Sequence, residues 1–221
     1  MRKTMLMNHI VLLFLFSLST LFAQEHPYFE GTISYKIEMK GEMVPQLQLN
    51  EPPNQMIMHV KDGSYIVNLK GGRYAKTFVF VSDSNRQYSV DFNNRMAYRY
   101  YPHNDIAQKD KEKLAASYTG KEVELNGHTV KIYQAKQGDT RFTYYVRDNL
   151  KVDVTNYPSD TRARANFLVE GLEGKIPVKT IKQQKGLTVI TSATRITARP
   201  FKEAQFRIPP GFTVKNRDYR W

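Results

Sequence analysis

The chain has 221 residues, no cysteine, and 33 Lys and Arg residues against 21 Asp and Glu residues, for a formal net charge of +12. The lack of cysteine excludes a disulfide-stapled scaffold and a lipid-anchored lipoprotein. So basic a chain attracts anionic partners, and because the sequence predicts export we expect an anionic membrane surface and no nucleic acid. The alternative is that the charges are spread over solvated strand faces and attract nothing specific.

The first 23 residues predict a secretory signal peptide. Arg2 and Lys3 precede the apolar run IVLLFLFSLSTLF at 10–22, and the small residue Ala23 follows it. This run is shorter than the about 20 apolar residues that a membrane-spanning helix needs. We therefore expect cleavage near Ala23, a periplasmic location and a single domain over residues 24–221. The alternative is an uncleaved membrane anchor.

Alternating apolar and polar residues predict strands from residue 31 onward. The first, GTISYKIEMK at 31–40, has a face of apolar residues: Ile33, Tyr35, Ile37 and Met39. Residues 41–54 contain three prolines and predict a loop. The next segment, 55–70, predicts a hairpin with a two-residue Asp62-Gly63 turn. This turn aligns large apolar residues on one face, pairing Val60 with Tyr65, Met58 with Val67 and Met56 with Leu69.

Residues 75–101 predict three more strands, with Phe78 and Phe80 on one face of the first. A three-residue turn at 93–95 suits the two asparagines there, because asparagine tolerates positive φ. It predicts a second apolar face that pairs Phe92 with Met96, Val90 with Tyr98 and Tyr88 with Tyr100. The opposite face of this hairpin would carry Ser89, Asp91, Ala97 and Arg99.

The second half of the chain also predicts strands joined by turns, together with two helices. We expect a helix at 103–118, a hairpin on Asn126-Gly127, two strands around Asp148-Asn149, a short helix at 159–172, and two long strands joined at Gly186. About a dozen strands and about two helices predict a mainly β fold of the α+β kind. Its centre would be a single curved antiparallel sheet that forms an incomplete barrel.

The sequence carries no pattern of catalytic or metal-binding residues. Four histidines follow the predicted signal peptide, and no two share metal-ligand spacing: His26, His59, His103 and His128. No nucleophile elbow and no phosphate-binding loop occurs. We therefore expect no metal, no cofactor and no enzymatic activity, and we interpret the histidines as polar surface residues.

The one-sided apolar faces are the informative feature. They are typical of an ordinary core, in which methionine fills gaps and tyrosine directs its hydroxyl outward. However, two helices cannot cover a sheet of a dozen strands, so we expect part of its concave face to remain as a pocket for an apolar ligand. The candidate ligand-binding residues are Met56, Met58, Val60, Tyr65, Val67, Leu69, Phe78, Phe80, Tyr98 and Tyr100.

Three motifs, FEGTISYKIEM, TGKEVELNGHTVKIYQAK and FRIPPGF, resemble an uncharacterised family of exported bacterial proteins that is similar to the LolA/LolB-like lipoprotein carriers. The matching residues are Phe29, Gly31, Ile33 and Tyr35 in the first motif, Gly127, Val130 and Tyr133 in the second, and Phe206, Ile208, Pro209, Gly211 and Phe212 in the third. The resemblance implies a LolA-like incomplete barrel closed by helices, with an apolar cavity for acyl chains.

We accordingly expect a periplasmic, non-enzymatic protein that binds a lipid, a lipidated protein or another hydrophobic ligand. Basic residues at the cavity rim would hold an anionic headgroup. One alternative is a small outer-membrane β-barrel, which the terminal Tyr219 and Trp221 would suit. Another is a structural or partner-binding domain with a filled core.

Overall fold

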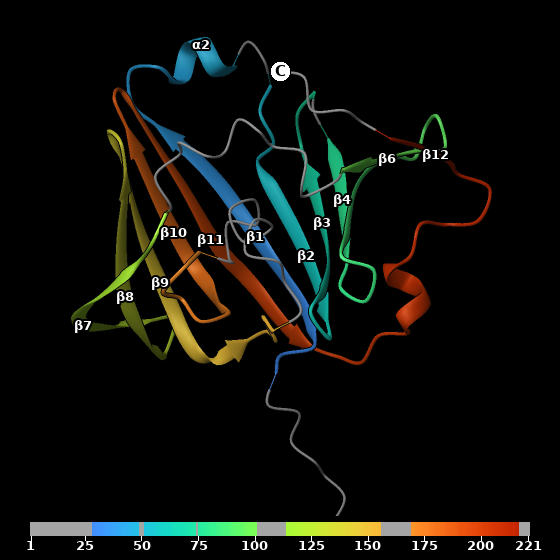
Figure 1. Cartoon of the computed structure of the whole chain (residues 1–221). Coiled ribbons are helices and arrows are strands. Elements are labelled where there is room, and N and C mark those ends of the chain that lie inside the picture. Colours follow the sequence, from blue (N-terminus) through green and yellow to red (C-terminus); the bar gives the residue numbers. More distant parts are fainter. Residues whose placement is uncertain (1–27, 49–50, 74, 101–113, 156–168, 217–221) are drawn as a thin grey trace, which may run out of the picture.

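The computed structural model describes residues 28–48, 51–73, 75–100, 114–155 and 169–216, and the predicted signal peptide lies outside these ranges (Figure 1). Within them one short helix, one 3₁₀ turn and twelve strands form: β1 (Gly31–Lys40), α2 (Val44–Gln48), β2 (Gln55–Lys61), β3 (Ser64–Lys70), β4 (Lys76–Val81), β5 (Arg86–Asp91), β6 (Met96–Tyr100), β7 (Ser117–Leu125), β8 (His128–Gln137), β9 (Thr140–Lys151), β10 (Lys175–Gln184), β11 (Leu187–Ala198), η3 (Glu203–Phe206) and β12 (Thr213–Asn216).

All of these strands belong to one sheet, in the order β12-β6-β5-β4-β3-β2-β1-β11-β10-β9-β8-β7. Two antiparallel meanders, β1–β6 and β7–β11, meet where β1 pairs with β11. Only β12 pairs in parallel, with β6, among the described strands. The sheet curves without closing, so the two meanders stand as facing arms (Figure 1). The predicted fold class, a mainly β protein built on one curved and incomplete sheet, is confirmed.

The hairpin of β2 and β3 has the predicted register. Val60 pairs with Tyr65, Met58 with Val67 and Met56 with Leu69. Asp62 and Gly63 both take positive φ, 44° and 76°, as the primed two-residue turns require. The predicted Asn126-Gly127 hairpin and the pair of strands joined at Gly186 are also present, as β7–β8 and β10–β11.

The hairpin of β5 and β6 was predicted with the wrong register. Its turn contains four residues, so Val90 pairs with Ala97 and Tyr98 pairs with Ser89. The Asp91 carboxylate accepts hydrogen bonds from the backbone N–H groups of Asn93 and Asn94, which closes the turn after Asp91. A shift of one residue moves every side chain of a strand to the other face relative to its partner. The expected single apolar face is therefore divided between the two sides of the sheet.

Three other predictions differ from the structure. Residues 140–151 form the continuous strand β9, and its Asp148 binds Lys131 of β8 at 2.6 Å instead of forming a turn. The prolines of 41–54 do not prevent the short helix α2, because Pro45 lies in its first turn where no N–H is needed.

The two predicted helices lie mostly outside the described residues. Their ends, 115–118 and 169–172, contain instead a bridge between Ala115 and Glu170 and the start of β7.

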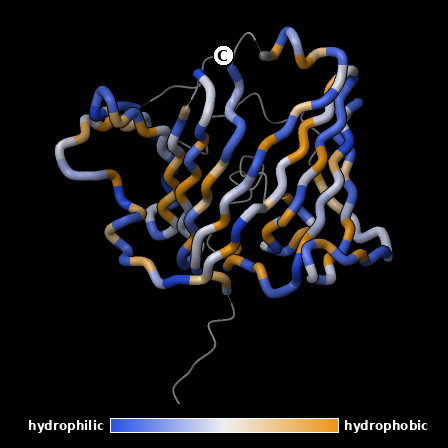
Figure 2. Tube along the Cα trace, turned by 180° about the vertical axis from the view of Figure 1, so that it is seen from behind, coloured by the Kyte–Doolittle hydropathy of each residue, from blue (hydrophilic) through white to orange (hydrophobic). Residues whose placement is uncertain are grey.

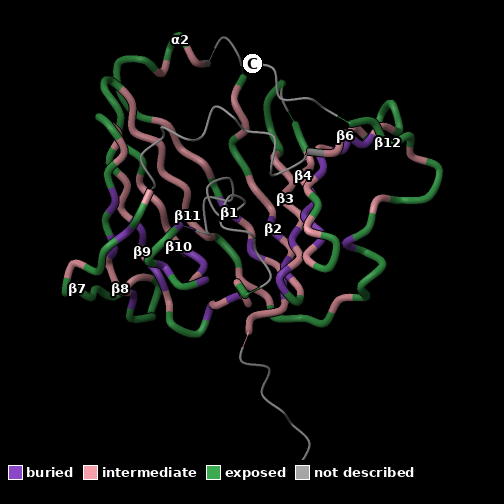
Figure 3. Tube along the Cα trace, viewed as in Figure 1, coloured by how far each residue is buried: buried purple, intermediate pink, exposed green. Residues whose placement is uncertain are grey.

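The main core fills the narrow end of the curved sheet. It joins residues from both arms: Ile33, Tyr35, Met58, Val60, Tyr65 and Phe80 from the first, and Val130, Leu150, Val152, Ile176 and Val178 from the second. Figure 3 shows the buried positions of β1, β2, β3 and β10 in the lower half of these strands, while their upper ends are half-buried or exposed. The arms thus touch at one end and diverge at the other.

A second layer covers the outer face of β3–β6. Its core consists of Val79, Val81, Tyr88, Val90 and Ala97, against which Ile66, Ile208 and Phe212 pack. The segment after β11, which includes η3, crosses this face and brings these last two residues onto it (Figure 1). Hydropathy alternates along the strands of this arm as well (Figure 2). The arm of β2–β6 therefore carries apolar residues on both faces, whereas a half-exposed hairpin would carry them on one face only.

Candidate functional site

An apolar groove lies on the concave face, at the end where the arms diverge. It is a half-open cavity of about 400 Å³. We call it the concave groove. It is lined by Tyr35, Ile37, Met39, Pro53, Met56, Met58, Tyr65, Val67, Leu69, Phe78, Gln87, Pro177, Thr180, Val189 and Thr191. Such a surface, mostly aliphatic and aromatic with a few polar groups, is the usual composition of a site for a hydrophobic small molecule.

The floor of the groove is closely packed. Tyr65 stacks on Phe80 with 5.2 Å between ring centroids, and Phe80 is fully buried. The hydroxyl of Tyr35 donates to the carbonyl oxygen of Pro177 at 3.0 Å, which ties β1 to β10. Burial raises the pKa of Tyr35 well above its usual range, so this hydroxyl stays protonated at neutral pH. The Tyr35 hydroxyl therefore links the two arms at the floor of the groove.

Six of the ten candidate residues meet in the concave groove: Met56, Met58, Tyr65, Val67, Leu69 and Phe78. Val60 and Phe80 lie in the core below it. Tyr98 is half-buried and does not line the cavity. It lies on the same face of the sheet as the groove, because it pairs with Ser89, which in turn pairs with Phe78. The backbone of Tyr100 pairs with Gln87, and its side chain lies outside the described part of the structure. Ligand binding by these residues stays a prediction.

The opposite wall was missed as a site. Ile37 and Met39 of β1 were expected to share a strand face, but only the pairing of β1 with β11 brings Val189 and Thr191 beside them. These strands lie at opposite ends of the sequence, so their contact leaves no local pattern. The sequence shows the alternation of apolar residues in each strand, but this alternation does not identify the strand with which it pairs.

Two lysines flank the open end of the groove. Lys76 pairs with Leu69 and Lys182 pairs with Val189, and cross-strand partners share a face, so both stand beside lining residues. The Lys182 ammonium lies 5.9 Å from the ring centroid of Phe142. Neither lysine forms an ion pair within the described ranges. Both side chains are exposed, and their charges lie beside an otherwise apolar cavity.

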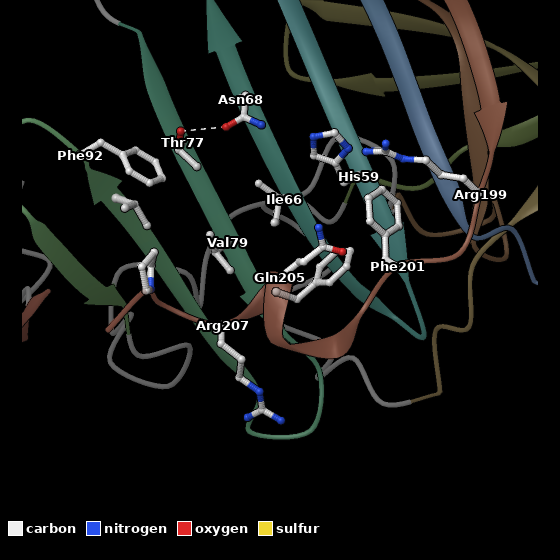
Figure 4. Close-up of a pocket in the computed structure, with 13 residues that line it drawn as sticks. His59, Ile66, Asn68, Thr77, Val79, Phe92, Arg199, Phe201, Gln205 and Arg207 are labelled. Carbon is white, nitrogen blue, oxygen red and sulfur yellow. Dashed lines mark hydrogen bonds between the residues drawn. The ribbon is translucent and has the colours of Figure 1, made fainter. Parts of the chain in front are cut away.

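A smaller pocket occupies the other face of the same arm, beneath the segment that follows β11 (Figure 4). It measures about 260 Å³, and we call it the outer pocket. Its lining is His59, Ile66, Asn68, Thr77, Val79, Val90, Phe92, Arg199, Phe201, Gln205, Phe206, Arg207 and Pro209. Because alternate residues of a strand face opposite sides, β3 contributes Val67 to the groove and Ile66 to this pocket. Sequence reasoning treated His59 as a surface residue and missed the pocket.

Three polar side chains of the outer pocket, those of His59, Asn68 and Thr77, have defined hydrogen-bond partners. Nδ1 of His59 lies 2.9 Å from the hydroxyl oxygen of Thr32, and Thr77 donates to the side-chain oxygen of Asn68 at 2.8 Å. Partial burial lowers the pKa of His59, and the positive charges of Arg199 and Lys70 lower it further. The imidazole is therefore neutral at pH 7.

Comparison with solved structures shows the fold. The structure of PNGF-II superposes on this chain with a TM-score of 0.50 and 12% sequence identity, covering 85% of this chain and 32% of PNGF-II. The chain therefore spans about a third of that protein's length. An uncharacterized conserved protein from Thermus thermophilus gives a TM-score of 0.48 at 11% identity, over 85% of this chain and 91% of its own.

LprF from Mycobacterium bovis gives a TM-score of 0.34 at 10% identity, over 83% of this chain and 90% of its own. No family model and no curated protein matches the sequence. The relationship to lipoprotein carriers that the sequence motifs imply therefore stays a prediction. Within the described ranges, no helix is both long enough and apolar enough to span a membrane.

Proposed function

We propose that the protein is a non-enzymatic, exported binding protein whose concave groove holds the hydrocarbon chain of a lipid or a lipidated protein. The observation that carries this proposal is the half-open apolar cavity between the two arms, with Met56, Met58 and Phe78 on one wall and Val189 on the other. Methionine side chains adapt to ligands of different shape, which suits a flexible hydrocarbon chain.

The energy of such binding comes from removing the chain from water. Each methylene group that the groove covers contributes about 0.8 kcal/mol, or about fourfold in affinity. The lysines at the open end, Lys76 and Lys182, would lie near an anionic head when the tail points toward Tyr65. The positive net charge of the chain adds a longer-range attraction toward anionic membranes.

The test measures affinity for linear carboxylates of increasing length, from octanoate to myristate, by displacement of a fluorescent fatty acid. We expect the affinity to rise by about fourfold per methylene and then level off when the groove is full. Replacing Val67 with Trp fills the cavity and should weaken laurate binding by about tenfold or more. The same replacement at the exposed Val123 of β7 serves as the control.

Two outcomes contradict the proposal. One is an affinity that does not depend on chain length, because the hydrocarbon would then not be the bound part. The other is an equal effect of Val67→Trp and Val123→Trp, which would place the ligand elsewhere. Lys76→Gln together with Lys182→Gln should weaken binding of laurate and leave binding of dodecanol unchanged. Equal losses of affinity for laurate and dodecanol would show that the lysines do not recognise the charged head of the ligand.

A further inference from the structure

We propose that the outer pocket is a second binding site, and that it takes a small organic anion in which a carboxylate is carried on an apolar body. Arg199 and His59 would hold the carboxylate, and the wall formed by β3–β5 would cover the apolar part. The outer pocket lies on the face of the sheet opposite the concave groove. The proposal therefore stands independently of the hydrophobic ligand proposed above.

Phe201 positions both nitrogen-bearing side chains. The guanidinium carbon of Arg199 lies 4.4 Å from the ring centroid of Phe201, and the His59 ring meets the same phenyl edge-on at 5.4 Å. Figure 4 shows the guanidinium of Arg199 beside the imidazole of His59. Two groups that repel each other when charged are thus held together by an aromatic ring that packs against each.

The charge of Arg199 is not balanced inside the pocket. No carboxylate lines it, and Arg199 forms no ion pair in the portion of the chain that the structure describes. The other arginine of the lining, Arg207, differs, because it binds Asp83 at 2.7 Å and also contacts Glu203. Glu30, near Phe201, accepts hydrogen bonds from Lys61 and from the Phe201 backbone N–H. Arg199 is the cation that remains for a ligand.

The state of His59 fits an anion site. Contact with the Thr32 hydroxyl fixes one ring nitrogen, so Nε2 is the nitrogen left for a ligand. Partial burial is the largest cause of its lowered pKa, and next come the positive charges of Arg199 and Lys70. A bound carboxylate offsets these two positive charges and favours the protonated ring. His59 then becomes a charge-assisted donor alongside Arg199, and anion affinity increases as the pH falls toward 6.

One wall of the pocket is apolar. Ile66, Val79, Val90 and Phe92 form the wall on β3–β5 and the turn that follows β5. A volume of about 260 Å³ is below the about 300–1,000 Å³ of sites for drug-sized ligands. The ligand class is therefore a short acid with one ring or a short branched chain, and phenylacetate is a suitable probe.

The experiment titrates the protein with phenylacetate and follows the ring resonances of His59 by NMR, assigned through their loss in His59→Asn. We expect saturable shifts and a raised His59 pKa in the bound state. Arg199→Gln should weaken phenylacetate by about tenfold or more, since a charge-assisted bond is lost. The control is Arg141→Gln on β9 of the other arm, which should leave the affinity unchanged. Arg199 is exposed, so its replacement should not unfold the chain, and a thermal melt checks this.

Neutral phenylacetamide and inorganic phosphate distinguish the two parts of the ligand. Weaker binding of both than of phenylacetate supports the proposal. Equal binding of phenylacetamide overturns it, because the charge would not be recognised. Equal binding of phosphate overturns the role of the apolar wall. An unchanged affinity in Arg199→Gln, or shifts of the same size at His128 as at His59, shows that the outer pocket is not the site.

Discussion

Removing the hydroxyl group of Tyr35 tests whether the two arms are held together at the floor of the groove. Tyr35 is 5% exposed, and its hydroxyl donates to the carbonyl of Pro177, 142 residues away in the sequence, at 3.0 Å. Tyr35→Phe keeps the ring and deletes one buried hydrogen bond, leaving a buried acceptor without this donor. We expect the free energy of unfolding to fall by about 1–2 kcal/mol.

The measurement is urea unfolding followed by far-UV circular dichroism, with the slope of the transition unchanged between variants. The control is Tyr118→Phe, because the Tyr118 hydroxyl contacts Glu122 at 3.4 Å on the exposed surface of β7. Its loss should cost less than about 0.5 kcal/mol. Equal losses for the two variants would refute the reasoning, since the buried link between the arms would then contribute no more than a surface contact.

Three further predictions concern stability. Phe80→Ala should lower the free energy of unfolding by about 3–5 kcal/mol, because a fully buried ring leaves a cavity, and a loss below about 1 kcal/mol in urea would contradict its place in the core. Gly171→Ala should destabilise the protein more than Gly138→Ala in the same assay; both have positive φ, but only at Gly171 would the new methyl group overlap a backbone carbonyl. Burial raises the pKa of Tyr35 and Tyr144, so above about pH 10 these two hydroxyls ionise in the unfolded state but not in the folded state. The free energy of unfolding should therefore fall by up to about 1.4 kcal/mol per pH unit for each tyrosine, and Tyr35→Phe should reduce this slope.

The local parts of the fold could be predicted because their signals are local. A two-residue turn at Asp62-Gly63 determines the β2–β3 register, and that register brings together five of the six candidates that line the groove. The sixth, Phe78, lies on β4. The β5–β6 hairpin shows the limit of this reasoning. Its asparagines allow a turn of three or four residues, and the choice depends on hydrogen bonds to the Asp91 carboxylate that the residue pattern does not reveal.

The remainder depends on contacts between distant segments. The second wall of the groove exists because β1 pairs with β11, and the outer pocket exists because the segment around Phe201 returns across β2 and β3. Alternation shows that a strand has an apolar face, but it does not show which other strand or segment covers that face. This is why His59, predicted as a surface residue, is instead half-buried against Phe201.

Strand β3 acts as a partition one backbone thick. Val67 and Leu69 open to one compartment, while Ile66 and Asn68 open to the other. Deleting a single residue within β3 would exchange the two linings: the amide of Asn68 would face the concave groove, and the side chain of Val67 would face the outer pocket. The length of this strand is therefore constrained more tightly than the identity of any one of its side chains, and homologues should vary in β3 by substitution and not by insertion or deletion.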